Sequence, residues 1–362
     1  MKILVVSYKK PSETVLSKLF LNNLSKKIQV LFVTYESKVS IKYETTKLKK
    51  INNNIRFFSA KNLSNLELII KKENPQLILS HFAENLTNKF EKLYIYLKQT
   101  NVTSVRIVDQ PFIWNRNFKK LTNKITKKKY IYDHGILCSK ASEYSHKYHA
   151  FKNKHLFCNK NYILHSNEKI KNPKNKKINL FVDENFVNHP DIKINNLKNF
   201  PTSEKYHNQL ISFFDFLKKE FKKKIYIAAH PSTLKNNYKK NRIIFNNTLK
   251  FVKIADLIIL HQSSAIDYAI LSKKDLLFIT TDKINKSQPG VTIKKISKFF
   301  NNKPLNLSIN YDSKLIKKRI VRYKDNINVY NKFINEFIKH PKFKQSIKIE
   351  KIYNRIVNEK TK

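Results

Sequence analysis

Glycine is almost absent from this sequence, which contains only Gly135 and Gly290. Phosphate-binding loops of the Walker and dinucleotide-fingerprint types need several glycines at fixed spacing. The sequence therefore excludes both kinds of loop. A bound phosphate would have to be held in another way, for which the free amides at the start of a helix are suited.

Cysteine and long apolar runs are also scarce. Cys138 and Cys158 form neither a CxxC metal pair nor a disulfide framework, so we expect two ordinary buried thiols. No uncharged apolar run approaches the roughly 18 residues that would cross a bilayer. The apolar stretch near Met1 is too short for a secretory signal and predicts a first buried strand. These features predict a cytoplasmic protein.

Acidic residues are few, 26 against 73 lysines and arginines, which gives a formal net charge of +47. Nearly all the basic residues are lysines, spread through every segment, whereas arginine is the stronger sign of a nucleic-acid reader. Abundant Lys, Asn, Ile, Phe and Tyr are typical of an AT-rich genome. The charge thus favours anionic substrates and contact with the anionic inner membrane face over nucleic acid.

Two series of alternating strand-like and helix-like segments make up the chain. In the first half, β-branched runs predict strands at 3–7, 28–35, 55–59, 77–80, 105–109 and 135–138, with helices at 15–24, 65–74, 88–99 and 139–149. In the second, the predicted strands are 178–182, 225–229, 242–245, 257–260 and 276–280, with helices at 203–223, 248–253 and 264–271. Strands that alternate with helices indicate mainly parallel sheets.

A polar stretch at 159–177, interrupted by Pro173, separates the two series. We therefore predict an α/β protein with two Rossmann-like domains at 1–165 and 166–310, followed by helices at 311–362 that pack across both domains. The tail is amphipathic and basic, so docking on a membrane surface is an alternative role for it.

Polar residues follow three of the strands predicted in the second half. They are Asp183 and Glu184 after 178–182, His230, Pro231 and Ser232 after 225–229, and His261, Ser263 and Ser264 after 257–260. Ligands of open parallel sheets bind at the carboxyl ends of strands, so these residues are the candidates for a site. Each motif alone is equally explained by structure, as a solvated acidic pair, a strand-end histidine or a serine cap.

The chemistry of the motifs is nevertheless complementary. One carboxylate can act as a general base towards an acceptor hydroxyl. His230 can stabilise a phosphate leaving group. Ser263 is a candidate N-cap of a helix whose amides would face the same phosphate. No DxD-like metal motif stands out.

An acidic pair, a His-Pro and a Ser-Ser, in that order and each closing a strand, resemble the signature of bacterial GT-B glycosyltransferases that use CMP-sugars. These include sialyltransferases and polysialyltransferases of capsule and lipopolysaccharide biosynthesis. The resemblance covers about residues 178 to 285 and includes 277–282. It departs at Asn185, where those enzymes usually have glycine, although asparagine tolerates the left-handed conformation better than most residues.

The resemblance implies two domains facing across a cleft, with the first on the acceptor side and the second binding the donor. One member of Asp183-Glu184 would be the base, and His230 would assist departure of the nucleotide. Ser263 and Ser264 would hold the donor phosphate, with Pro231, Ser232 and His261 beside them. The implied reaction is a metal-independent single displacement that needs no cofactor besides the nucleotide sugar.

The leading hypothesis is thus transfer of a sugar from a nucleotide donor to a surface glycan or glycolipid. A CMP-linked nonulosonate or Kdo is the first choice of donor. A sugar-nucleotide epimerase of similar build is the alternative, and a basic nucleic-acid-binding protein is a third, weaker one. In the first half, 109–111 and Trp114 could face the acceptor, while His81 and His134 are expected to be structural.

Overall fold

The computed structural model describes residues 1–8, 10–24, 27–35, 54–81, 91–108, 130–144, 149–168, 178–188, 201–230, 233, 238, 242–344 and 347–360. The chain divides into two compact units. Unit 1 contains the described residues up to Lys160 and again from Glu336 onwards, and unit 2 contains those from Asn161 to Asn335. The predicted tail segment, 311–362, is thus shared between the units, and the boundary near 165 lies inside a helix.

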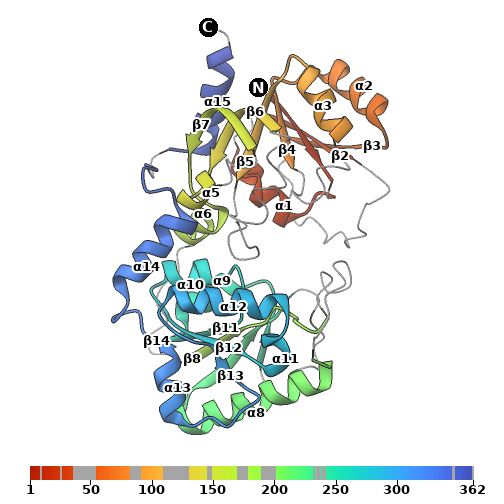
Figure 1. The fold of residues 1–362 in the computed structure, drawn as a ribbon. Coiled ribbons are helices and arrows are strands. Elements are labelled where there is room, and N and C mark those ends of the chain that lie inside the picture. Colours follow the sequence, from red (N-terminus) through yellow and green to blue (C-terminus); the bar gives the residue numbers. More distant parts are fainter. Residues whose placement is uncertain are drawn as a thin grey trace. The chain divides into compact units, whose positions relative to one another are not determined.

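Unit 1 contains a seven-stranded parallel sheet in the order β3-β2-β1-β4-β5-β6-β7. Its strands are β1 (Lys2–Ser7), β2 (Gln29–Tyr35), β3 (Ile55–Ala60), β4 (Leu77–His81), β5 (Thr103–Val108), β6 (Tyr130–Leu137) and β7 (His149–Leu156). Its helices are α1 (Glu13–Lys18), a 3₁₀ turn (Leu21–Asn23), α2 (Leu63–Glu73), α3 (Glu91–Gln99), α5 (Lys140–Tyr144) and α15 (Ile349–Lys360), and α15 lies beside β7 in Figure 1.

Unit 2 contains a second sheet in the order β10-β9-β8-β11-β12-β13, with β14 antiparallel to β12. Its strands are β8 (Ile178–Val182), β9 (Lys224–Ala228), β10 (Arg242–Ile244), β11 (Leu257–Leu260), β12 (Asp275–Thr280), β13 (Leu305–Asn306) and β14 (Ile320–Val321). Its helices are α6 (Lys160–Asn167), α8 (Ser203–Phe221), α9 (Thr248–Ile254), α10 (Ile266–Leu271), α11 (Asp282–Asn285), α12 (Gln288–Phe299), α13 (Ser313–Arg319) and α14 (Ile327–Phe333), which continues into a π-helical turn (Ile334–Ile338).

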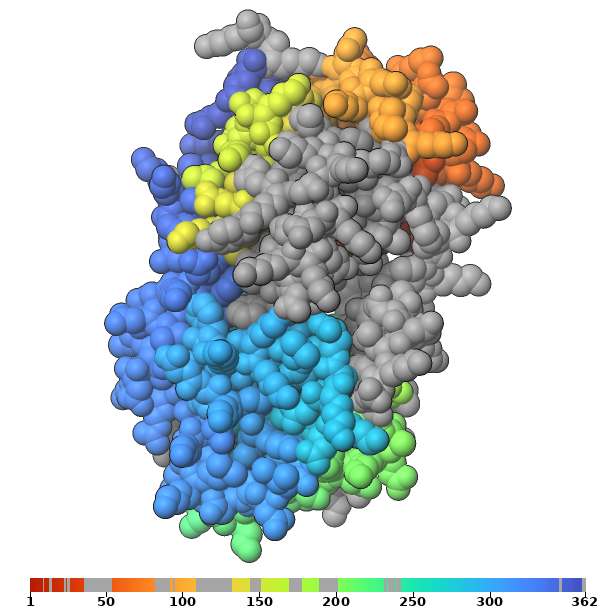
Figure 2. All heavy atoms as spheres, viewed as in Figure 1, coloured from red at the N-terminus to blue at the C-terminus, as the bar shows by residue number. Residues whose placement is uncertain are grey.

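Helices cover both faces of the sheet in unit 2. Figure 1 shows α8 on one face and α9, α10 and α12 on the other. On the side seen in Figure 2, the surface of this unit is formed mainly by segments that follow β10, coloured cyan to blue. Because the sheet is covered on both sides, β8 and β11 are buried along their whole length, and all their residues except Asn179 are apolar.

Helix α8 anchors the core of unit 2. The Thr202 side chain caps its start by accepting a hydrogen bond from the amide of Lys205. Its buried face includes Tyr206, Leu210, Phe213, Phe214 and Leu217. These side chains pack against the strands, which fixes α8 on the sheet.

Both glycines lie where a side chain would not fit. A Cβ at Gly290 would be 2.1 Å from the carbonyl oxygen of Ile284, and one at Gly135 would be 2.5 Å from the ring of Phe151. Left-handed backbone positions are instead taken mostly by asparagine: the described residues with positive φ are Phe20, Asn74, Asn185, Lys222, Asn246, Lys273 and Asn301. The scarce glycines are therefore reserved for close approach and not for turns.

Two predicted segments are corrected. The stretch 159–177 is expected to be a linker, but α6 occupies Lys160–Asn167, and Asn161 from this helix is buried. The tail is expected to be helical throughout, yet β14 pairs with β12 between α13 and α14. Among the described residues, no helix is both long and apolar enough to span a membrane.

Candidate functional site

Three neighbouring strands of unit 2 carry the predicted motifs at their carboxyl ends. Strand β8 is central, with β9 on one side and β11 on the other. Val182 pairs with Ala228, and Phe181 pairs with Ile259, so the residues that follow each strand emerge side by side. We call the segments 183–185, 229–230 and 261–264 the strand-end site. The order of the sheet therefore brings the three motifs together, as expected from the sequence.

Asp183 is buried and is held by hydrogen bonds on both carboxylate oxygens. Its Oδ1 accepts from the amide of Asn185 at 2.7 Å, and its Oδ2 accepts from the hydroxyl of Thr233 at 2.6 Å. Asn185 has a φ of 48°, which confirms that asparagine adopts the left-handed turn here. Asp183 thus shapes the turn after β8, and its oxygens are engaged within the protein.

Glu184 lies next to the turn that follows β11. Its Oε1 accepts a hydrogen bond of 2.7 Å from the backbone amide of Gln262. Burial of the carboxyl group, with a smaller contribution from the negative charge of Asp183, raises the pKa of Glu184 to about 8. The amides of Gln262, Ser263 and His261 act in the opposite direction. Glu184 therefore changes its ionisation close to neutral pH.

His261, which the sequence places beside the donor phosphate, has its side chain held inside the protein. It is fully buried, and its two ring nitrogens contact the hydroxyl of Tyr206 at 2.9 Å and the carbonyl oxygen of Ile279 at 2.8 Å. Because a carbonyl can only accept, Nδ1 carries the proton and Nε2 accepts from Tyr206. Burial lowers the pKa of His261 to about 4, so the ring is neutral.

Ser263 and Ser264 occupy the turn before α10. The Ser263 hydroxyl accepts a hydrogen bond from the amide of Ala265 at 3.2 Å, and α10 begins only at Ile266. Ser263 is half-buried and Ser264 is exposed. From α6, the side-chain amide of Asn161 donates to the carbonyl of Ser264 at 3.2 Å and to Asp267 at 2.9 Å. Glu184 on one side and Asn161 on the other thus hold the turn. Neither serine is fully buried.

His230 follows β9 and is half-buried. Its carbonyl accepts the amide of Thr233 at 2.9 Å, which begins the turn that brings Thr233 to Asp183. Pro231 and Ser232 lie outside the described residues, as do 109–111, 189–191 and Trp114.

Three residues hold the site in place although no sequence motif indicates this role for them: Asn161, Tyr206 and Thr233. The alternation of side chains along β11 could have indicated the role of His261. Leu257, Ile259 and His261 are two residues apart, so they lie on the same face of the sheet, which packs on α8. Nothing in the sequence indicates the other contacts, since they join segments far apart in the chain.

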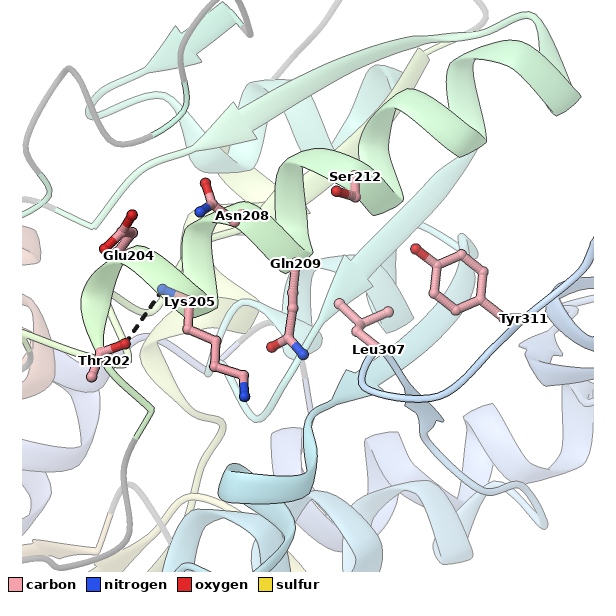
Figure 3. Close-up of a pocket in the computed structure, with 8 residues that line it drawn as sticks. All are labelled: Thr202, Glu204, Lys205, Asn208, Gln209, Ser212, Leu307 and Tyr311. Atoms are coloured by element: carbon pink, nitrogen blue, oxygen red, sulfur yellow. Dashed lines mark hydrogen bonds between the residues drawn. The ribbon is translucent and has the colours of Figure 1, made fainter.

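A groove runs along α8 near the end of β13. Figure 3 shows its lining residues, which are Thr202, Glu204, Lys205, Asn208, Gln209, Ser212, Leu307 and Tyr311. Its volume is about 510 Å³, which suits a ligand of the size of a nucleotide or sugar. Gln209 donates to the hydroxyl of Ser308 at 3.0 Å, and the same hydroxyl accepts the amide of Asp282, just past β12. The groove therefore opens at the same sheet edge as the strand-end site.

The two parallel-sheet α/β units confirm the fold class that the sequence predicts. No family model matches the sequence, and no curated protein matches it. Among solved structures, a variant of the wall teichoic acid polymerase TagF is similar, with a TM-score of 0.55 at 13% identity over 99% of this chain and 90% of that chain.

Two further structures share the fold. A TagF structure soaked with CDPG gives a TM-score of 0.53 at 13% identity and covers 100% of this chain and 90% of that chain. The glycotransferase of kitacinnamycin gives 0.50 at 10% identity and covers 91% of this chain and 92% of that chain. Identities this low establish a shared fold only, and it is a fold found in glycosyltransferases.

Proposed function

We propose that this protein is a glycosyltransferase that moves a sugar from a nucleotide donor to a surface-glycan acceptor. The observation that carries the proposal is the contact between Glu184 and Gln262, which joins the acidic motif to the serine turn at the ends of adjacent strands. A titratable carboxyl group therefore lies directly beside the hydroxyls that would bind a phosphate. The fold shared with TagF and the kitacinnamycin enzyme supports the same function.

Glu184 is the better candidate for the general base. Both oxygens of Asp183 accept hydrogen bonds within the protein, so Asp183 is suited to positioning. A pKa of about 8 for Glu184 is close to the value at which a base works best near neutral pH. In this proposal Glu184 accepts the proton of the acceptor hydroxyl as that oxygen attacks the anomeric carbon.

The raised pKa also resolves a conflict between a carboxylate and a neighbouring phosphate. At pH 7 the Glu184 carboxyl group is mostly protonated, so it repels an incoming phosphate little. Ser263 and Ser264 would then hold that phosphate through their hydroxyls, and His230 would stabilise the departing nucleotide. We therefore expect kcat to rise, and donor affinity to fall, as the pH increases through about 8.

The donor is proposed to carry cytidine, with a CMP-linked nonulosonate or Kdo as the first choice. The sequence resemblance favours CMP, and a TagF structure has been obtained with CDPG. The groove along α8 offers amide and hydroxyl groups from Asn208, Gln209 and Ser212 to a polar part of the donor. A cytoplasmic enzyme at the inner membrane face, with basic residues towards anionic lipid, fits a glycolipid acceptor.

The test is to titrate the purified protein with CMP-, UDP- and GDP-sugars by calorimetry and to follow donor hydrolysis and transfer by chromatography. Glu184→Gln should retain donor binding and lose at least about 100-fold in kcat, within the range expected for a general base. His230→Ala should also slow nucleotide release. Asp215→Asn is the matched control, because Asp215 is exposed and pairs only locally with Lys218.

Three results would contradict the proposal. If no nucleotide sugar binds, the site is not a donor site. If Glu184→Gln transfers sugar at the wild-type rate, Glu184 is not the base. If a UDP-sugar is converted to an isomer without any acceptor, the protein is an epimerase instead.

A further inference from the structure

Two histidines and a glutamate meet in unit 1, whereas the described residues proposed for transfer belong to unit 2. His134 lies on β6, His155 on the neighbouring edge strand β7, and Glu359 near the end of α15. Each offers a ligand atom, and these atoms lie within 4.8 Å of one another. His134 is expected from the sequence to be structural, and no sequence motif includes His155 or Glu359.

The separations are close to those of ligands around one metal ion. His134 Nδ1 is 2.9 Å from His155 Nε2 and 3.9 Å from a carboxylate oxygen of Glu359. Two nitrogens bound at about 2.0–2.1 Å to a tetrahedral Zn²⁺ lie about 3.4 Å apart. Shifts of about 0.5 Å in these two pairs would therefore bring His134 to such separations from the other two ligands.

The two histidines face each other inside the protein. His134 and His155 are both buried, and burial lowers the pKa of His134 and brings that of His155 to about 4. The hydrogen bond between the two rings places a proton on one of the facing nitrogens, so that ring must change its tautomer before both nitrogens can bind a metal ion. The other charged groups that act on them are Asp133 and Lys152, which pair with each other, and Arg355.

The cluster has one open side. His134 and Glu359 line a hollow of about 360 Å³ together with Thr100, Asp133 and Asn153. Three protein ligands beside an open space correspond to a site whose fourth position is taken by water or another small ligand. Lys98 and Lys152 also line the hollow and would favour an anionic fourth ligand.

We propose that His134, His155 and Glu359 form a binding site for Zn²⁺ or a similar divalent transition-metal ion. The ion joins the edge strand β7 and its neighbour β6 to the last turn of α15. It is bound by unit 1 and is independent of the metal-free transfer reaction proposed for unit 2. Two imidazoles and one carboxylate are ligands that suit zinc and exclude calcium or magnesium.

The test uses the full chain, freed of metal by a chelator and titrated with Zn²⁺ by calorimetry. One ion per chain should bind tightly. His155→Gln and Glu359→Gln should each weaken the affinity at least about 100-fold, since even indirect support of a ligand contributes 10–100-fold. Glu359 is 46% exposed, so its variant keeps the fold, which circular dichroism without metal would verify.

His165→Gln is the matched control. His165 is half-buried, and its pKa, like that of His155, is lowered to about 4, but it contacts Ser272 in unit 2. The His165→Gln variant should bind Zn²⁺ as the wild type does. In a separate measurement, Co²⁺ bound to the wild-type chain should give the intense visible absorption of a four-coordinate ion. Wild-type affinity in either ligand variant, or no binding to the wild-type chain, would overturn the proposal.

Discussion

Replacement of Glu184 by glutamine should change how the stability of unit 2 depends on pH. The pKa of this carboxyl group is about 8 in the folded chain and 4.5 ordinarily. Between these two values the unfolded chain ionises while the folded chain holds its proton, so stability falls as the pH rises. Above about pH 8 this loss is complete, and below 4.5 it is absent. Glutamine removes the loss and can still accept from the amide of Gln262.

The size of the effect follows from the two pKa values. At 1.36 kcal/mol per pKa unit, the rise from 4.5 to about 8 sets an upper limit of about 5 kcal/mol. Glu184 is only half-buried, so solvent screening reduces this to about 2 kcal/mol. The Tm of the variant minus that of the wild type should therefore be larger at pH 9 than at pH 5. For a unit of this size, the increase in this difference is about 4–8 °C.

The assay is differential scanning calorimetry of both proteins between pH 5 and pH 9. Other titrating groups contribute equally to the two chains and cancel in the difference. Asp215→Asn, at a carboxylate that is 64% exposed, should show no such trend. If the difference between Glu184→Gln and the wild type is the same at pH 5 and pH 9, Glu184 does not have a raised pKa, and its assignment as the base fails too.

Substitutions at three further positions test the fold of unit 2. Thr233→Val removes a hydrogen bond from the buried carboxylate of Asp183 and should lower the free energy of unfolding by about 1.5–3 kcal/mol, whereas Thr233→Ser should restore most of it in urea denaturation. Lys222→Gly, at a φ of 51°, should raise stability by about 0.5–1 kcal/mol, and a loss would show that the left-handed backbone carries no strain. Gly290→Ala would place a Cβ 2.1 Å from the carbonyl of Ile284 and should lower the free energy of unfolding by about 3 kcal/mol or more, so a Tm like that of the wild type would refute the close approach.

Much of the fold could be predicted from the sequence because its strands are apolar runs of ordinary length. Strands β8 and β11 begin and end where the sequence predicts. Strand β7 was missed because it lies at the edge of the sheet and alternates lysine, asparagine and histidine with few apolar residues. Strands β13 and β14 are each two residues long, too short to leave a periodic pattern.

The candidate site was predicted in outline for a topological reason. The carboxyl ends of parallel strands lie at one edge of a sheet, so residues 183, 230 and 261 are expected at the same edge, and the observed order β9-β8-β11 makes their strands neighbours. What could not be predicted is which hydrogen-bond donor each carboxylate oxygen accepts from. The contacts of Glu184 with Gln262 and of Thr233 with Asp183 join residues 78 and 50 positions apart, and depend on side-chain direction.

The division of the chain between its units has a consequence for synthesis. The core of unit 1 includes Ile352, Tyr353 and Ile356 of α15, although its sheet is built from residues before 157. A ribosome therefore releases all the residues of unit 2 before it has made the helix that completes unit 1. The usual order, in which the N-terminal domain matures first during translation, is reversed. The nascent first sheet must wait, with part of its apolar surface uncovered, until translation is nearly finished.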